Sequence, residues 1–317
     1  MDWFDTLTDD TPTYTPFAVP PFSLVDARKG PWKARKRWWV DKGIRGELGR
    51  DTALLPGTSS IGPDTVYGRC SSTGKRGEYT TSVFDPVLCE ILYNWFCPPE
   101  GHVLDPFAGG AVRGVVASVT GRTYTGVDLS QRQVESNRRL AASLDTPRVR
   151  WEVGDSSKVQ SLVEGPFDFI FSCPPYWNLE KYSDDPRDLS TLTYEGFLDK
   201  YREIISESAA LLDDDAFACF VVGDVRERNS NGAYVGFVAD TIKAFQEAGL
   251  PLYNDILYVY PDGSLPMRAG RSLRATRKIS KTHQNVLVFL KGDARRAAAR
   301  MGVTVPTRPG ITGEEAP

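Results

Sequence analysis

The sequence predicts an α/β fold in which a mostly parallel sheet is covered by helices on both faces. Three apolar segments, 102–105, 124–128 and 150–155, each end in an aspartate. A glycine-rich turn at 106–110 follows the first segment and precedes the helix-compatible run Val115–Val119. A strand, a tight glycine turn and a helix open the doubly wound folds, in which the helix amides face a ligand.

The remaining elements continue this alternation of strands and helices. Ser130 is a candidate cap for the helix that follows the second strand. The basic loop 262–283 lies between the last two strands. The further elements that we expect are the strands Phe167–Ile170, Ala216–Val222, Asp255–Tyr260 and Asn285–Leu290, and the helices Ser130–Ala142, Tyr194–Leu212 and Val235–Ala248.

The end of the strand Phe167–Ile170 is the most informative part of the chain. It continues into Phe171-Ser172-Cys173-Pro174-Pro175-Tyr176-Trp177, which combines short polar side chains, two rigid prolines and two aromatic rings. Such a turn offers a fixed carbonyl, a small side chain and a flat ring, which together can hold a planar heterocycle. A turn that merely ends the strand is the alternative, because proline also stops a sheet ladder.

These motifs resemble those of the S-adenosylmethionine-dependent DNA methyltransferases that modify exocyclic amino groups, at N6 of adenine or N4 of cytosine. The resemblance lies in Asp-Pro-Phe-Ala-Gly-Gly at 105–110 and Cys-Pro-Pro-Tyr at 173–176, in this order and spacing. In this family the loop at 105–110 contacts the methyl donor, and we call it the donor loop. Segment 82–92 is similar to the family's helix before this loop, and segment 281–292 is similar to its last strand. Residues 22–50 resemble the region that precedes such domains in phage-encoded DNA-modification methylases.

The resemblance implies a Rossmann-like class I methyltransferase fold, with a mostly parallel seven-stranded sheet that has one antiparallel edge strand. It implies S-adenosylmethionine as the methyl donor, no metal, and a flipped base in double-stranded DNA as the acceptor, as in restriction-modification. The residues that it places on the donor are Ser82, Phe84, Asp105, Pro106, Phe107, Gly109, Gly110, Asp128, Leu129, Asp155 and Ser156. Those that it places at the reacting base are Ser172, Cys173, Pro174, Pro175 and Tyr176.

Cys173 departs from the family pattern, which has Asp, Asn or Ser before the two prolines. A thiol is a weak hydrogen-bond acceptor, so amino methylation would need help from Ser172 or the backbone. A thiol can instead act as a nucleophile in carbon-5 methylation of a pyrimidine. The sequence is also compatible with an RNA methyltransferase, with a non-catalytic DNA-binding relative, and with a Cys173 that is merely buried.

Positive charge gathers in two segments, although the whole chain has a net charge of −3. Residues 28–50 contain nine Lys and Arg against two acids, and residues 264–283 contain six against none. Clusters of this kind suit contact with phosphates, and the first also contains three tryptophans. The predicted DNA-binding residues are Lys33, Arg35, Lys36, Arg37, Trp38, Arg268, Arg271, Arg274, Arg277 and Lys278.

We therefore expect an N-terminal arm with a basic, aromatic extension over 1–77 and a catalytic domain over 78–292. Residues 293–317 should form an Ala/Arg helix and a partly disordered tail. The five cysteines lack disulfide or zinc spacing. Without a long apolar run or a signal-peptide pattern, a cytoplasmic monomer or dimer with no membrane association is expected.

Overall fold

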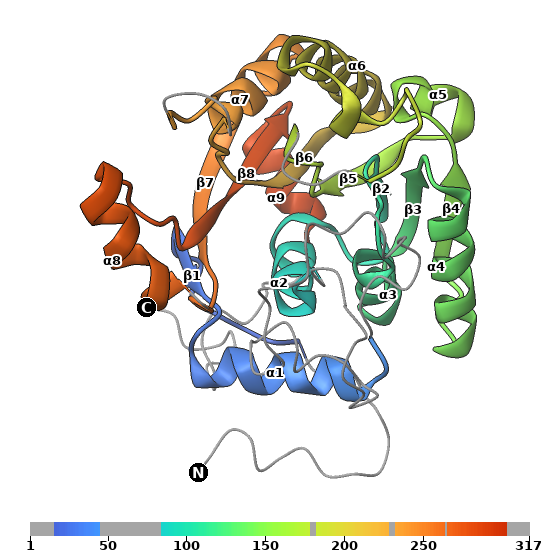
Figure 1. The fold of residues 1–317 in the computed structure, drawn as a ribbon. Coiled ribbons are helices and arrows are strands. Elements are labelled where there is room, and N and C mark those ends of the chain that lie inside the picture. The colour runs from blue at the N-terminus through green and yellow to red at the C-terminus, as the bar shows by residue number, and fades with distance from the viewer. Residues whose placement is uncertain (1–15, 45–83, 178–181, 228–231, 264, 303–317) are drawn as a thin grey trace, which may run out of the picture.

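The computed structural model describes residues 16–44, 84–177, 182–227, 232–263 and 265–302, which surround one central sheet (Figure 1). The eight strands of this sheet have the order β1-β7-β8-β6-β5-β2-β3-β4. Their bounds are β1 Leu24–Asp26, β2 His102–Asp105, β3 Thr123–Asp128, β4 Val149–Val153, β5 Phe167–Ser172, β6 Leu212–Val222, β7 Leu252–Val259 and β8 His283–Lys291. Only β8 runs antiparallel to its neighbours.

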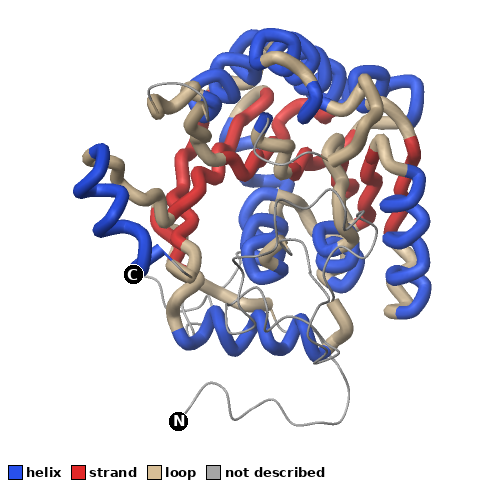
Figure 2. Tube along the Cα trace, in the orientation of Figure 1, coloured by secondary structure: helices blue, strands red, loops and turns tan. Residues whose placement is uncertain are grey.

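Helices cover both faces of the sheet, as Figure 2 shows. The helices are α1 Gly30–Asp41, α2 Pro86–Phe96, α3 Val112–Val119, α4 Gln131–Ser143, α5 Val159–Leu162, α6 Tyr194–Leu211, α7 Phe237–Glu247, α8 Leu265–Thr276 and α9 Ala294–Arg300. One apolar cluster joins the sheet to α1, α2 and α3, and a second joins it to α6 and α7. Ser130 caps α4 as predicted, because its Oγ accepts from the amide of Gln133.

The predicted Rossmann-like architecture is confirmed, with two differences in the sheet. It has eight strands, not seven, because β1 pairs in parallel with β7. The antiparallel strand β8 does not form the edge but lies inside the sheet, between β6 and β7, and β1 forms the edge. A strand of three residues has too short an alternation of buried and exposed positions to be found from sequence. As β1 belongs to the main sheet, the described part of the N-terminal region is continuous with the methyltransferase-like body.

The buried carboxylate of Glu90 on α2 fixes α1 to this body. Its two oxygens accept from Nε and Nη2 of Arg35 at 2.9 and 2.8 Å, and from Nε1 of Trp39 at 2.8 Å. The amide of Phe17 donates a further bond at 2.8 Å. Glu90 has 0% exposure, and such a buried charge is tolerated only when it is fully paired.

Asp85, which caps α2, forms a second attachment for α1. Lys36 Nζ and the hydroxyl of Tyr258 each lie 3.0 Å from Asp85 Oδ2, and Nε1 of Trp32 lies 3.3 Å from both oxygens. The carboxylate thus links α1, α2 and β7.

These contacts correct part of the predicted DNA surface. Arg35 is wrong as a DNA contact, because its guanidinium is buried against Glu90. Trp38 is half-buried, with the Arg35 guanidinium 4.1 Å from its ring centroid, and Lys36 is held by Asp85. Lys33 and Arg37 are exposed, and their contact with DNA stays a prediction.

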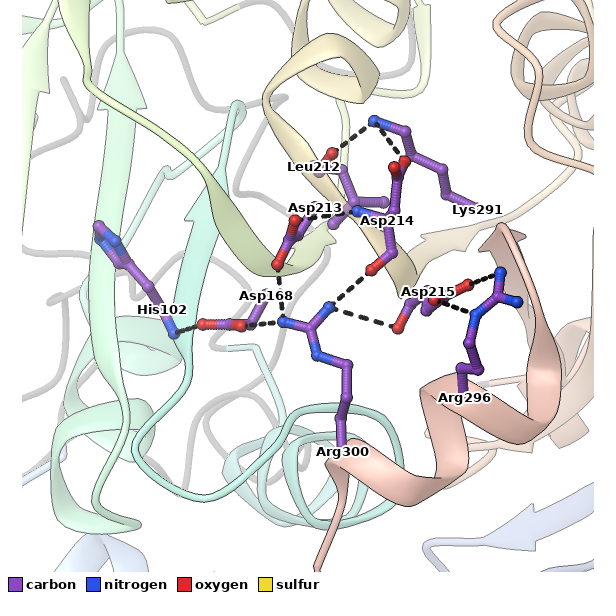
Figure 3. Close-up of polar contacts among 9 residues, drawn as sticks. All are labelled: His102, Asp168, Leu212, Asp213, Asp214, Asp215, Lys291, Arg296 and Arg300. Atoms are coloured by element: carbon purple, nitrogen blue, oxygen red, sulfur yellow. Dashed lines mark hydrogen bonds and ion pairs between the residues drawn. The ribbon is translucent and has the colours of Figure 1, made fainter.

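Helix α9 connects strands at the end of the sheet where β2, β5 and β6 begin (Figure 3). Arg300 contacts Asp168 near the start of β5 and lies 2.9 Å from Oδ2 of Asp213 on β6. Asp168 also accepts from the amide of His102 at 2.8 Å. The expected Ala/Arg helix is therefore part of the body, while residues 303–317 lie outside the described residues. Among the helices that the structure describes, none is long and apolar enough to cross a membrane.

We expect that Glu90→Ala lowers the free energy of unfolding by about 3–5 kcal/mol, because it removes the carboxylate that the buried Arg35 guanidinium faces. Chemical denaturation provides the measurement. Glu247→Ala is the control, since Glu247 pairs with Arg202 and Lys243 at half-exposed positions and should contribute less than about 1 kcal/mol. Equal losses in the two variants would contradict the role assigned to Glu90.

Stability should also depend on pH through the two histidines of the chain. Burial lowers the pKa of His102, and burial and Lys281 lower that of His283. The unfolded chain then binds more protons below pH of about 6.5, so the free energy of unfolding should fall as pH drops from 7.5 to 5.5. In His102→Gln/His283→Gln most of this dependence should disappear. Urea midpoints across this range provide the test, and an unchanged dependence would disprove the assignment.

Candidate active site at the carboxyl ends of the strands

Four neighbouring parallel strands, β5, β2, β3 and β4, bring the predicted motifs to one edge of the sheet. Leu104 on β2 pairs with Ile170 on β5, and Asp105 on β2 pairs with Gly126 on β3. The donor loop that follows β2 therefore lies between the acid that ends β3 and the Cys-Pro-Pro-Tyr turn that follows β5. The structure places the two predicted halves of the site side by side.

The carboxylate of Asp105 is the buried centre of this arrangement. Its Oδ1 accepts from Ser172 Oγ at 2.5 Å and from the amide of Phe107 at 3.2 Å. Its Oδ2 accepts from Nε of Arg113 at 2.5 Å and from the hydroxyl of Tyr124 at 2.7 Å. Burial and the nearby carboxylate raise the pKa of Tyr124 well above its usual value, so Tyr124 remains a donor.

Arg113 connects this centre to the donor loop. Its Nη2 donates to the carbonyls of Phe107 and Ala108 at 2.8 and 2.9 Å. Burial alone would lower the pKa of Arg113, but Asp105 raises it above its usual value. The guanidinium therefore stays charged and holds the loop through these two carbonyl groups. It also lies under Phe84, with 4.8 Å between the guanidinium carbon and the ring centroid.

Two predicted site residues therefore have supporting roles. Asp105 has 0% exposure and already accepts four hydrogen bonds, so it offers no oxygen to a donor molecule. Ser172 is also fully buried and donates to Asp105, so it cannot reach a base beyond the turn. The predictions that Asp105 binds the donor and that Ser172 acts at the base are wrong in this structure.

The donor loop is fixed by its backbone. The amide of Gly109 donates to Oδ2 of Asp128 at 2.9 Å, and its carbonyl accepts from Asn137 Nδ2 at 2.7 Å. Gly109 has φ +49°, in the region that disfavours side chains. Ser156 is buried and donates to the carbonyl of Pro106 at 2.6 Å. Ser156 and Pro106 thus support the loop from within, while Gly110 and Phe107 are half-buried at its surface.

Two acids remain accessible along this edge. Asp128 is half-buried at the end of β3, and its Oδ1 accepts from the amide of Ser130 at 2.8 Å. Asp155 follows β4 and accepts from the amide of Ser157 at 3.0 Å and from Lys200 Nζ at 3.3 Å. Burial would raise the pKa of Asp155, but these partners lower it below its usual value, so the carboxylate is charged.

This edge has the features that bind an adenosyl group with an amino-acid tail. Carboxylates at successive strand ends accept hydrogen bonds from ribose hydroxyls in nucleotide-binding folds, and Asp128 occupies such a position. The bare backbone at Gly109 and Gly110 permits close approach. Phe107, Leu129 and Phe84 are half-buried and add apolar surface. Ser82 is also a predicted contact of the donor, but it lies outside the described residues.

The Cys-Pro-Pro-Tyr turn is anchored through Tyr176. The hydroxyl of Tyr176 accepts from Nε2 of Gln284 on β8 at 2.7 Å and lies 3.3 Å from the carbonyl of Val221. Cys173 Sγ lies 3.7 Å from the same hydroxyl. Burial, followed by the nearby Cys173, raises the pKa of Tyr176 well above its usual value, so the phenol stays protonated.

The surroundings of the turn also restrict its two aromatic rings. Tyr176 packs against Phe237, with 6.0 Å between the ring centroids. Nε1 of Trp177 donates to the carbonyl of Leu192 at 3.1 Å, and Trp177 has φ +47°. Cys173, Pro175 and Tyr176 are half-buried, whereas Pro174 is buried. Together they form a rigid turn with a partly accessible surface.

Sequence reasoning missed four residues of this site: Arg113, Tyr124, Lys200 and Gln284. Gln284 lies inside the segment 281–292 that resembles the family, and Arg113 follows the Asp-Pro-Phe-Ala-Gly-Gly motif, but nothing in their spacing marks either residue. Tyr124 lies in an apolar strand, where an aromatic residue is typical of the core. Lys200 lies on α6, 45 residues after its partner Asp155, so no local pattern connects the two.

A family model matches the part of the chain that contains the Cys-Pro-Pro-Tyr turn. Residues 167–309 match the family model of DNA methylases of the N6/N4 type. The predicted resemblance to DNA amino-methyltransferases is thereby confirmed. The matched region contains the Cys-Pro-Pro-Tyr turn, Gln284 and α8, and begins after the donor loop. The more specific similarity to phage enzymes stays a prediction.

Solved methyltransferase structures are also similar to this chain. TrmN from Thermus thermophilus is 17% identical with a TM-score of 0.44, and the alignment covers 66% of this chain and 49% of that one. This chain thus spans about half the length of TrmN. A methyltransferase from Pyrococcus furiosus is 17% identical with a TM-score of 0.45, covering 67% and 85%. A putative RNA methyltransferase, PH1948 from Pyrococcus horikoshii, is 12% identical with a TM-score of 0.48, covering 82% and 100%. No curated protein sequence matched.

We expect Asp105→Asn to lower the free energy of unfolding by about 3–5 kcal/mol, because it leaves the buried Arg113 without its ionic partner. Asp128→Asn is the matched control: it is half-buried and holds two loop amides, so its loss should stay below about 2 kcal/mol. Urea denaturation of both variants provides the measurement. A larger loss for Asp128→Asn would show that Asp105 is not the centre of the site.

Proposed function

We propose that this protein transfers a methyl group from S-adenosylmethionine to an exocyclic amino group of a base in DNA, at N6 of adenine or N4 of cytosine. The DNA methylase match and the Rossmann-like fold support the coarser assignment, a methyltransferase that uses this donor. The choice of a base amino group rests on the match to DNA methylases of the N6/N4 type, and one contact supports the juxtaposition that this transfer needs. The hydrogen bond between Ser172 and Asp105 joins the Cys-Pro-Pro-Tyr turn to the donor loop, so a base at the turn would adjoin a donor at the loop.

S-adenosylmethionine, when bound, supplies a methyl group that is already activated by its sulfonium. The task of the protein is therefore alignment, which can contribute about 7–11 kcal/mol to lowering a barrier. We assign Gly109 and Gly110 to backbone contact with the donor, and Asp128 to its ribose hydroxyls. Asp155 lies further along the same edge, where its charged carboxylate suits a polar group of the donor.

The acceptor side must draw hydrogens away from the base amine, because its lone pair is delocalised into the ring. We assign this role to the carbonyl groups of the Cys173–Pro174 backbone, with Cys173 Sγ as a weaker acceptor. Pro174 and Pro175 hold this backbone in one conformation. Tyr176 provides a ring against which the base stacks, and Gln284 and Phe237 fix the plane of that ring.

The substrate that fits this assignment is a base that has left its duplex. An amino group inside a base pair cannot reach a turn at the sheet edge, so the nucleotide must be extruded at a cost of a few kcal/mol. The exposed cations of the chain provide phosphate contacts that offset this cost. This is the physical reason to expect duplex DNA as the partner.

The thiol of Cys173 favours a second candidate function, carbon-5 methylation of a pyrimidine. In this reaction the thiolate adds to carbon 6, and the ring's carbon 5 takes the methyl group. A base then removes the carbon-5 proton, and the carbon–sulfur bond breaks to release the thiolate. Cys173 is half-buried in the turn, and this partial accessibility is compatible with either role.

A single assay separates these candidates. The protein is incubated with duplex DNA, or with RNA, and a tritiated donor, and the product is digested to nucleosides. Label in N6-methyladenosine or N4-methylcytosine supports the proposal, and label in 5-methylcytosine supports the second candidate. Label only in RNA would overturn the proposal, and no label despite measurable donor binding would overturn both candidates. Asp128→Ala should weaken donor binding in calorimetry.

Cys173→Ser distinguishes the two mechanisms directly. For amino methylation, the hydroxyl is a better acceptor, and one improved hydrogen bond of about 1 kcal/mol would raise kcat about fivefold. For a covalent mechanism, the same variant should lose all activity, because the nucleophile is gone. Steady-state kinetics with the tritiated donor provide the measurement, and donor affinity, which should not change, is the control.

A further inference from the structure

Helix α8 differs from every other described helix in how little it contributes to packing. None of its residues from Leu265 to Thr276 is buried. Figure 1 shows α8 projecting from the side of the sheet beside β1 and β7. Gly270 in its interior lowers its intrinsic helix propensity, while Pro266 lies in the first turn, where proline is tolerated. A helix that is neither buried nor strongly favoured by its own sequence is suited to contact with a partner.

The arginines of α8 lie on one side of it. Arg268, Arg271 and Arg274 are exposed and follow one another at intervals of three residues. Because each interval turns the helix by about 300°, they form a single inclined stripe. The half-buried Leu265, Ala269 and Ser272 fall on a separate side. The stripe therefore points away from the body of the protein.

The charge of the stripe is strong and uniform. Arg277 and Lys278 continue it as exposed cations after the end of the helix. Residues 264–283 contain no Asp or Glu. The apolar side chain of Met267 stands beside the arginines and is 79% exposed. A polyanion with some apolar surface would complement this combination.

The arm that contains α8 is joined to the candidate active site. It leaves β7 and returns into β8, and its base is closed by Tyr260, whose amide and hydroxyl donate to the carbonyls of Thr282 and Lys281, both at 3.3 Å. Gln284, just inside β8, donates to Tyr176 of the Cys-Pro-Pro-Tyr turn. Gln284 therefore connects the end of the arm directly to the turn to which we assign the binding of the nucleobase.

We propose that α8 docks into the major groove of double-stranded DNA and positions the duplex for extrusion of its base. The inference rests on the proposed function for the identity of the partner. A helix of about 10–12 Å diameter fits the B-form major groove, which is about 12 Å wide. The arginine stripe reaches the phosphates that border the groove, and Met267 faces its floor, where thymine methyl groups lie. The major groove of duplex RNA is too narrow for such a helix.

Helix α1 offers a matched comparison, because it also has an exposed basic row. Lys29, Lys33 and Arg37 recur every four residues along its outer side. However, α1 starts at the edge strand β1 and ends where Gly43 meets Leu144, after the end of α4. Its side chains are anchored at Asp85 and Glu90, whereas the arm of α8 reaches the Cys-Pro-Pro-Tyr turn directly through Gln284. We therefore expect the cations of α1 to contribute less than those of α8 to the affinity for the duplex.

The test compares Arg271→Ala/Arg274→Ala/Arg277→Ala with Lys29→Ala/Lys33→Ala/Arg37→Ala, which lose the same charge. Fluorescence anisotropy gives the affinity for a duplex of about three helical turns between 50 and 200 mM salt. Each lost phosphate contact lowers the slope of log K against log salt by about 0.9. We expect a decrease of about 2–3 for the α8 variant and less than about 1 for the α1 variant. Thermal midpoints should match the wild type.

The outcomes also separate this inference from the proposed function. An unchanged slope in the α8 variant, or tighter binding of duplex RNA than of duplex DNA, overturns the inference. If the wild type labels DNA while the α8 slope is unchanged, only the inference fails. If the wild type binds duplex DNA through α8 but transfers no label and binds no donor, the proposed function fails and the docking role stands.

Discussion

The whole candidate site depends on one buried carboxylate, that of Asp105. Taking this charge out of water is costly unless every lone pair finds a donor. Its four partners come from β5, β3, α3 and the donor loop itself. Satisfying the carboxylate therefore fixes the relative positions of two strands, a helix and a loop. The alignment that the proposed methyl transfer needs is therefore set by the requirement to pair a fully buried charge.

Buried carboxylates that accept several hydrogen bonds also attach the N-terminal region to the body. Glu90 on α2 and Asp85, the N-cap of α2, accept hydrogen bonds from cationic and indole groups of α1. Asp85 also accepts from Tyr258 on β7. Much of the basic and aromatic character of α1 is thereby used inside the protein. Positive charge in the sequence consequently overstated the nucleic-acid surface of this segment. In α8, by contrast, nothing is buried, and the charge stays outside.

The order of the strands and helices, the donor loop and the Cys-Pro-Pro-Tyr turn followed from the sequence, because each is encoded in a run of neighbouring residues. The roles of Asp105 and Ser172 did not follow. The side chain of an acid that ends a parallel strand can point toward a ligand or toward the helices that cover the sheet. The side chain of Asp105 points toward Arg113 on α3. Gln284 and Lys200 act across long separations in sequence. Helix α8 falls in a predicted loop, because Gly270 disfavours a helix interior and none of its residues is buried to mark an apolar side.

The surroundings of Cys173 explain why a weak acceptor is compatible with amino methylation. The turn is restricted at several points: its tyrosine contacts Gln284, Val221 and Phe237, and two prolines restrict the backbone. When position supplies most of the barrier reduction, the strength of one acceptor matters less than the constancy of its place. A side chain that is small enough to leave the Pro174 backbone unmoved then suffices. Cysteine meets this requirement as well as serine does, so its presence does not exclude catalysis of amino transfer.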